Sequence, residues 1–206
     1  MSSSKRLFDI AASLTCLLVL SPLLLAIAIA VKIDSPGPAL YVQERVGRKG
    51  KLFRLLKFRT MRVGADKAGP LVTKEGDSRI TRVGHWLRNS KLDELPQLFN
   101  VLRGDMSLVG PRPEVPRYVE VWPDDARSEI LAVRPGITDP ASVEYFDEAA
   151  LLRNCADVEQ AYLTTILPRK LEIYRQYVRD RSFVGDIAIL MQTAARLLRR
   201  GGWRTG

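Results

Sequence analysis

The apolar positions divide the chain into a strongly hydrophobic N-terminal segment and a longer remainder in which apolar and polar residues alternate. Residues 10–31 contain no charged side chain, and Asp9 and Lys32 bound this run. As a straight helix its 22 residues would extend about 33 Å, which is enough to cross a hydrocarbon core of about 30 Å. We therefore expect residues 10–31 to enter a membrane.

Three interpretations of this apolar run compete. Lys5 and Arg6 precede it, as in a cleaved signal peptide, but the run is long for that class. The length of the run, taken by itself, supports a straight spanning helix. Ser21 and Pro22 lie at the middle of the run, where proline bends a helix by removing a backbone hydrogen bond and a serine hydroxyl can satisfy a freed backbone group. The pair favours a helix-break-helix hairpin that enters the membrane and returns, with a kinked spanning helix as the alternative.

Basic residues on both sides of the run also favour the hairpin. Lys5 and Arg6 precede it, and residues 41–62 hold eight Lys or Arg against one Glu. Such flanks prefer the cytoplasmic side of a membrane. A hairpin leaves both flanks there, whereas a straight span would export one. We predict a re-entrant membrane helix over residues 1–35 and a domain at the cytoplasmic face over residues 36–206.

Short strands and helices are predicted for the remainder. Periodicity and turn signals indicate strands at 40–45 and 51–58, a loop at 63–78, a helix at 81–89, a helix in DELPQLFNVLRG that ends at Gly104, and a constrained loop at 106–116. Residues 186–200 form an amphipathic helix, whose apolar face packs either on a core or in a lipid interface. The expected fold class is α+β and predominantly helical, with a small β-hairpin and amphipathic interfacial helices packed on a compact cytoplasmic domain.

Composition narrows the partners of the chain. Its 206 residues carry a formal net charge of +9, which predicts an anionic partner such as nucleic acid, acidic lipid or a phosphorylated small molecule. The single histidine, His85, excludes a multi-histidine metal site. Cys16 and Cys155 lie in an apolar run and an acidic stretch, so we expect no disulfide between them and a reducing compartment.

Asp93 and Glu94 place two carboxylates side by side in this basic chain. Adjacent residues differ by about 100° around a helix, so the two cannot share one helix face. Either they cap a helix that begins between Leu92 and Leu95, which Pro96 supports, or they form a phosphoryl-transfer site. The basic residues around them are Lys57, Arg59, Arg82, Arg88, Lys91, Arg103, Arg112 and Arg117. Arginines hold phosphate oxygens bidentately, and a carboxylate can anchor Mg²⁺ or attack phosphorus.

Several stretches, taken in order, resemble the bacterial sugar transferase family, the monotopic phosphoglycosyl transferases. They are KRLFDI (5–10), the apolar run with Ser21-Pro22, SPGPALYVQERVGRKGKLFRLLKFRTM (35–61), RITRVGHWLRNSKLDELPQLFNVLRGDMSLVGPRP (79–113) and RPGIT (134–138). The resemblance runs from about residue 5 to residue 200 and is most specific in LDELPQLFNVLRGDMSLVGPRP. It is a resemblance to the minimal form of the family, without the extra transmembrane bundle of larger relatives.

The resemblance implies a membrane enzyme that moves a sugar-1-phosphate from a UDP-sugar to polyprenyl (undecaprenyl) phosphate and releases UMP. This would be the first membrane step of surface-glycan or glycoconjugate assembly, at the cytoplasmic face of the bacterial inner membrane, with its anionic lipid as a partner. Mg²⁺ is the implied cofactor. No nucleic-acid partner is expected, and a homo-oligomer is left open.

The resemblance also assigns roles to residues. Asp93 matches the nucleophile that becomes covalently attached to the phospho-sugar, and Glu94 assists as a base or by positioning the metal, so that both are assigned to Mg²⁺. Arg88 and Arg112 match the phosphate-site arginines, and we add Lys57 and Arg59 to the substrate-binding set. Ser21 and Pro22 match the break of the re-entrant helix.

The chain departs from the family pattern at residues 139–142, Asp-Pro-Ala-Ser, so no sugar is assigned.

Two other classes of protein would also explain the net charge of +9: a membrane-tethered nucleic-acid-binding protein and a non-catalytic basic peripheral membrane protein. Against the first, Asp93 and Glu94 would stand at the start of the recognition helix, where phosphates approach, and no pattern of basic and stacking aromatic residues is present.

Overall fold

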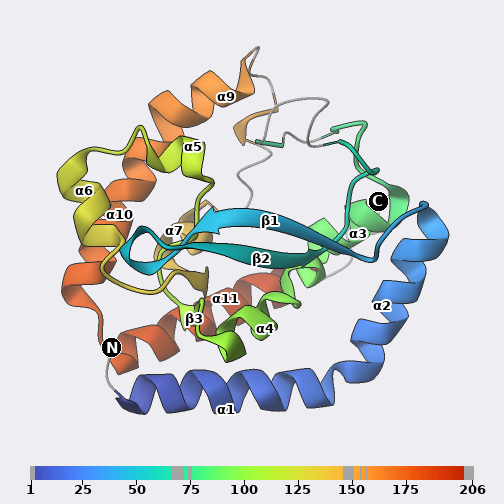
Figure 1. Cartoon of the computed structure of the whole chain (residues 1–206), viewed down its shortest axis with the longest axis horizontal. Coiled ribbons are helices and arrows are strands. Elements are labelled where there is room, and N and C mark those ends of the chain that lie inside the picture. Colours follow the sequence, from blue (N-terminus) through green and yellow to red (C-terminus); the bar gives the residue numbers. More distant parts are fainter. Residues whose placement is uncertain are drawn as a thin grey trace.

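A computed structural model describes residues 3–65, 72–73, 76–145, 151–153, 155 and 157–201. Across these ranges, helices surround a two-stranded antiparallel sheet that crosses the middle of the molecule (Figure 1). The two N-terminal helices form an L along the lower and right edges in that view. The predominantly helical α+β fold with a small β-hairpin is therefore confirmed. Part of the expected loop at 63–78 lies outside the described residues.

The apolar run folds as two helices, α1 (Ser3–Val19) and α2 (Ser21–Asp34), bent by 64° at their junction. Pro22 lacks the N–H that would bond the carbonyl of Leu18, four residues back. The Ser21 hydroxyl donates to that same oxygen at 2.8 Å, as expected. Within the described ranges, no single helix has the length and apolarity of a membrane span, but this bent pair does when its two helices are taken together.

The expected β-hairpin is confirmed. Strand β1 (Leu40–Val46) pairs with β2 (Leu52–Phe58) through the 3-10 turn η1 (Arg48–Gly50), in a register that joins Leu40 to Phe58 and Val46 to Leu52. Lys57 is the second-last residue of β2, and the chain leaves the sheet after Phe58.

The loop predicted at 106–116 is wrong in part, because residues 107–109 form a strand. Strand β3 (Ser107–Val109) pairs in parallel with β4 (Gly136–Thr138), which lies far along the sequence. The close approach needs glycines, since a Cβ at Gly136 would lie 2.1 Å from the backbone nitrogen of Gly110. A strand of three residues with a distant partner leaves no periodic signal of its own.

The region around Asp93 contains three short elements: α3 (Arg82–Ser90), the 3-10 turn η2 (Leu92–Glu94) and α4 (Gln97–Arg103). The helix expected at 81–89 and the stop at Gly104, with φ of 92°, are confirmed. Element η2 begins at Leu92, inside the interval from Leu92 to Leu95 where a start or a break was expected, and a turn at Leu95–Pro96 separates it from α4. No side chain caps η2 or α4 through a hydrogen bond, so capping of that kind is wrong, and Pro96 is the residue before α4. Asp93 and Glu94 do lie in the first turn of η2, as expected for acids at a helix start.

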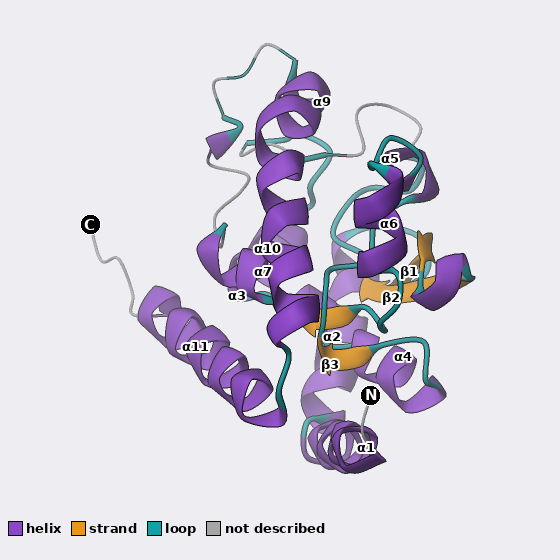
Figure 2. Ribbon diagram, turned by 90° about the vertical axis from the view of Figure 1, so that its left-hand side faces the viewer, coloured by secondary structure: helices purple, strands orange, loops and turns teal. Residues whose placement is uncertain are grey.

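The remaining helices are α5 (Pro116–Val119), α6 (Asp124–Ile130), α7 (Pro140–Glu144), α9 (Val158–Ala161), the π-helical turn η3 (Tyr162–Ile166), α10 (Leu167–Asp180) and α11 (Phe183–Gly201). The largest apolar core joins α5, α6 and α10 and includes Trp122 and Tyr174. Helix α11 runs along the side of the molecule (Figure 2). Its Met191 and Leu198 are 67% and 78% exposed, so this part of the expected apolar face is not packed on a core.

Polar contacts hold the start of α1 on the domain. Arg6 donates to the carbonyls of Val101 and Leu102 at 2.8 and 3.1 Å, at the C-terminal end of α4. Asp9, which is 1% exposed, accepts from the Ser107 hydroxyl at 2.8 Å.

Apolar contacts hold the other helix of the pair. Ile27 and Val31 of α2 pack with Phe58 and Leu87. Both helices therefore rest against the same domain.

Candidate active site

Asp93 and Glu94 lie on η2, between α3 and α4. Lys91 turns the chain from α3 into η2 with a left-handed backbone conformation, φ 58°. Helix α3 approaches the end of β2 closely, because a Cβ at Gly84 would lie 2.1 Å from the carbonyl oxygen of Thr60. This packing brings the end of β2 and the two carboxylates into one site.

Glu94 is held by two cations from distant segments. The Lys57 ammonium lies 3.0 Å from Oε1. The Arg112 guanidinium is bidentate, with Nη2 2.5 Å from Oε1 and Nη1 3.2 Å from Oε2. Burial pushes the pKa of Glu94 upward, but the charges of Arg112 and Lys57 outweigh burial and hold the pKa well below its usual range. Glu94 is therefore an ionised group with both oxygens already engaged.

Asp93 has the opposite surroundings. Its side chain is buried, with 6% of the residue exposed, and Oδ1 has no hydrogen-bond partner in the described part of the chain. Burial raises the pKa of Asp93, and the positive charge of Lys57 offsets part of that effect. A buried carboxylate oxygen without a partner is costly to keep, which suggests that a substrate atom or a cation completes its coordination.

Arg88 belongs to this site, whereas Arg59 does not. Arg88 donates from Nε to the Thr60 hydroxyl at 2.9 Å, and its charge favours the ionised form of Asp93. Arg59 points away, toward the end of α2. Its guanidinium donates to the backbone oxygens of Val31, Ser35, Pro36 and Pro38. The structure thus brings together Asp93, Glu94, Lys57, Arg88 and Arg112 from the expected set and gives Arg59 a different set of contacts.

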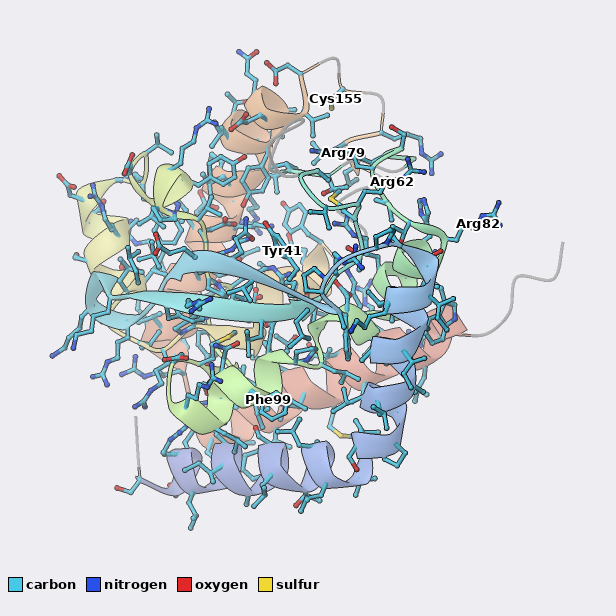
Figure 3. All side chains as sticks on the ribbon, turned by 45° about the vertical axis from the view of Figure 1, so that its right-hand side comes forward. Tyr41, Arg62, Arg79, Arg82, Phe99 and Cys155 are labelled. Carbon is cyan, nitrogen blue, oxygen red and sulfur yellow. The ribbon has the colours of Figure 1, made fainter. Side chains whose placement is uncertain are left out.

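Further basic side chains lie on the α3 side of the site. Arg62, Arg79 and Arg82 gather beyond the end of the sheet (Figure 3), and the backbone of Arg62 donates to the carbonyl of Arg79 at 3.1 Å. Arg79 is paired with Asp77 at 2.6 Å.

Two buried polar residues that were not among the predicted site residues follow from the structure, Gln97 and Asp139, the second within the stretch 139–142 that departs from the family pattern. Gln97, the first residue of α4, is 1% exposed, and its Nε2 is buried without a hydrogen-bond partner among the described residues. Its spacing of four from Asp93 is the only signal in the sequence that could have singled it out. Asp139 is fully buried, accepts from the Ser142 backbone nitrogen at 2.9 Å as the cap of α7, and lies near Arg112.

The donor set at the site fits a metal with few protein ligands. In the ranges that the structure describes, no group of three or more His, Cys, Asp or Glu side chains could hold a metal ion. Mg²⁺ typically takes one or two carboxylates and completes its shell with water and substrate oxygens. Since Glu94 already accepts from Lys57 and Arg112, the unpartnered Oδ1 of Asp93 is the oxygen best suited to Mg²⁺.

Comparison with known proteins finds the same family over nearly the whole chain. The family model for bacterial sugar transferases matches residues 1–200. An Aeromonas hydrophila UDP-N-acetylgalactosamine-undecaprenyl-phosphate N-acetylgalactosaminephosphotransferase is 37% identical over 202 residues, which is 97% of this chain and 45% of the relative. This chain therefore spans about half the length of that relative.

Shorter relatives match over more of their length. A Caulobacter vibrioides UDP-glucose:undecaprenyl-phosphate glucose-1-phosphate transferase is 38% identical over 94% of this chain and 69% of the relative. The exopolysaccharide production protein PSS of Rhizobium leguminosarum is 40% identical over 96% of both chains. The chain therefore belongs to the bacterial sugar transferase family.

Proposed function

We propose that this protein transfers a sugar-1-phosphate from a UDP-sugar to undecaprenyl phosphate and releases UMP. The observation that carries the proposal is the contrast between the two carboxylates: Glu94 is clamped by two cations, whereas Asp93 keeps a buried oxygen without a partner among the described residues. The names of the relatives support this reaction class, and one of them, an exopolysaccharide production protein, supports a role in surface-glycan assembly. Within that role we propose the first membrane step.

The reaction proceeds in two displacements at one phosphorus atom. A carboxylate oxygen of Asp93 attacks the β-phosphorus of the UDP-sugar, the bond to the bridging oxygen breaks, and its electron pair leaves with UMP. An oxygen of undecaprenyl phosphate then attacks the same phosphorus, and the electrons of the acyl-phosphate bond return to Asp93. A covalent intermediate lets one site meet a water-soluble donor and a lipid acceptor in turn.

The cations around the dyad position and neutralise the phosphates. Phosphate oxygens can accept hydrogen bonds from Arg88. They can also accept from the N–H groups of Arg112 that do not contact Glu94. Both oxygens of Glu94 are engaged, so Glu94 orients Lys57 and Arg112 instead of taking a proton. The acceptor phosphate is already anionic and needs no base. When bound, Mg²⁺ neutralises charge on the diphosphate, and Asp93 Oδ1 with the adjacent Glu94 charge would hold it.

The N-terminal helices form a re-entrant hairpin in this proposal. Lys5, Arg6 and Asp9 of α1 contact α11, α4 and β3, while the end of α2 is held by Arg59. A straight span would carry Lys5 across the bilayer, where it could not reach the domain. The exposed apolar side chains Leu7, Leu14, Leu18, Leu25 and Ile33 then face lipid.

Exposed residues of α11, such as Met191, extend this surface, which fits an interfacial helix at the cytoplasmic face of the inner membrane.

The test is UMP release by the full chain in a lipid nanodisc with undecaprenyl phosphate, Mg²⁺ and a panel of UDP-sugars. We expect release with at least one sugar, abolished by Asp93→Asn and retained in Asp180→Asn, a matched change at the exposed end of α10. No release with any sugar would contradict the proposal, and it would favour a non-catalytic lipid-binding protein. Salt-dependent DNA binding without release would favour a nucleic-acid-binding protein.

A further inference from the structure

A cavity of about 340 Å³ lies where the starts of α1 and α11 meet the segment between α6 and β4. Figure 1 places the beginnings of both helices at the same corner of the molecule. The contact between Phe8 and Phe183, with ring centroids 5.4 Å apart, confirms that the two helix starts are neighbours. The side chains that matter for its chemistry are Lys5, Arg48, Arg134, Arg181, Phe183 and Asp186.

The cavity has a strong excess of positive charge. Four basic side chains line it, and Asp186 is the single carboxylate among its described lining residues. That carboxylate already binds Lys5 and accepts from the Tyr177 hydroxyl at 2.7 Å. The one carboxylate of the described lining is therefore engaged by Lys5 and Tyr177, and the lining keeps an excess of basic side chains.

Two of the arginines are fixed by backbone oxygens. Arg48 donates from Nε to the carbonyl of Ala132 at 3.0 Å, and Arg134 donates from Nε to that of Gly104 at 2.7 Å. Burial lowers the pKa of Arg134, the charges of Arg6 and Arg48 lower it further, and the charge of Asp9 offsets part of this effect. Holding like charges together in this way costs free energy that a bound anion would recover.

The apolar side of the cavity indicates what kind of anion fits. Phe183, Val109 and Val133 line it together with the arginines. Beside it, Leu7 of α1 is 68% exposed and Val184 of α11 is 78% exposed, on the surface that we propose faces lipid. A molecule with an anionic head and an apolar tail could bind the arginines with its head and contact the apolar side chains with its tail.

The cavity is separate from the two carboxylates of the active site. The cations around the dyad, Lys57, Arg88 and Arg112, are absent from its described lining. Helix α4 separates the two places: the turn that contains Glu94 comes before its N-terminal end, and Gly104, whose carbonyl binds Arg134, follows its last residue. Occupation of the cavity is therefore compatible with an occupied active site.

We propose that this cavity is a non-catalytic binding site for the phosphate of an anionic membrane phospholipid. The guanidinium groups of Arg48, Arg134 and Arg181 receive the phosphate, and the acyl chains leave along the exposed apolar surface of α1. The inference rests on the proposed membrane position of α1 and is independent of the transferase reaction. A lipid bound here would fix the distance between the membrane surface and α4.

The test uses the full chain in a neutral detergent, with lipid adducts counted by native mass spectrometry. The probes are dioleoyl phosphatidylglycerol, dioleoyl phosphatidylcholine and inorganic phosphate. The variant is Arg48→Gln with Arg181→Gln, two exposed positions whose loss leaves the core intact. The control is Arg117→Gln with Arg169→Gln, which removes the same charge from exposed sites on α5 and α10.

We expect the wild type to bind one phosphatidylglycerol in preference to phosphatidylcholine. The Arg48/Arg181 variant should bind it at least about tenfold more weakly, since each arginine–phosphate contact contributes a charge-assisted hydrogen bond. The control variant should bind as the wild type does. Equal binding of the two lipids, or an equal loss in the control, would overturn the proposal. Binding of inorganic phosphate as tight as that of the lipid would replace it with a site for a free anion.

Discussion

Two adjacent carboxylates acquire different chemistry from their surroundings. Glu94 meets Lys57 and Arg112, which come from β2 and from the loop after β3, and both of its oxygens are used. Asp93 points into a buried space where Oδ1 has no partner in the described residues. Two cations offset the charge of Glu94, but Glu94 still adds to burial in raising the pKa of Asp93.

The bidentate contact between Arg112 and Glu94 gives a prediction at this scale. Arg112→Lys keeps the charge but loses the planar fork, so we expect the kcat of UMP release to fall by about 10- to 100-fold. The measurement is steady-state UMP release with saturating donor and acceptor. Arg103→Lys, at the exposed end of α4, is the control and should retain the wild-type kcat. A kcat within twofold of wild type in Arg112→Lys would show that the fork has no role.

At the scale of elements, the break between α1 and α2 is built from two residues with complementary effects. Pro22 removes the donor that the Leu18 carbonyl would have used, and the Ser21 hydroxyl supplies another at 2.8 Å. The bend of 64° then directs α2 toward β2 and α3.

Replacing the proline tests whether this break decides topology. In Pro22→Ala we expect a straighter helix that carries the N-terminus across the bilayer. The measurement is labelling of Ser3→Cys by an impermeant thiol reagent added outside intact cells, after Cys16 and Cys155 have been changed to alanine. We expect no labelling with Pro22 present and labelling in the Pro22→Ala variant. External labelling while Pro22 is present would contradict the hairpin.

The contacts of Arg59 predict a structural role for that residue. Four backbone oxygens between Val31 and Pro38 accept from its guanidinium, so Arg59→Ala leaves buried carbonyls without donors. We expect a loss of several kcal/mol in the free energy of unfolding, about 1 kcal/mol or more for each orphaned group, seen as a lower Tm. The exposed Arg62→Ala is the matched control and should leave Tm unchanged. An unaltered Tm with a raised KM for the UDP-sugar would return Arg59 to the substrate site.

Elements with local signals were predictable, and contacts between distant segments were not. The β-hairpin, α3 and the stop at Gly104 follow from turn residues and periodicity in single stretches. The β3–β4 pair depends on a close approach of two glycines that no local pattern reports. Lys57 and Arg59 look equivalent in sequence, yet the chain leaves β2 at Phe58, and only Lys57 then points to Glu94.

At the scale of the whole molecule, polar contacts near Lys5 and apolar contacts near Val31 join α1 and α2 to the rest of the fold. The three apolar cores of the described residues contain neither Asp93 nor Glu94, the two proposed metal ligands. Metal binding and folding are therefore expected to be independent.

Chelation tests this independence. Adding EDTA should abolish UMP release, and adding excess Mg²⁺ should restore it. The Tm of the chain without substrate should change little, because no group of three protein ligands exists in the described ranges. A large fall in Tm on chelation would indicate a structural metal and contradict this arrangement.

The most direct measurement is the intact mass of the protein after it is mixed with its UDP-sugar and Mg²⁺, without undecaprenyl phosphate. We predict a mass gain of one sugar-phosphate on the wild-type chain, located on the peptide that contains Asp93, and its loss when undecaprenyl phosphate is added. Asp93→Asn should gain nothing. Normal UMP release by Asp93→Asn, or the same adduct on that variant, would contradict Asp93 as the nucleophile.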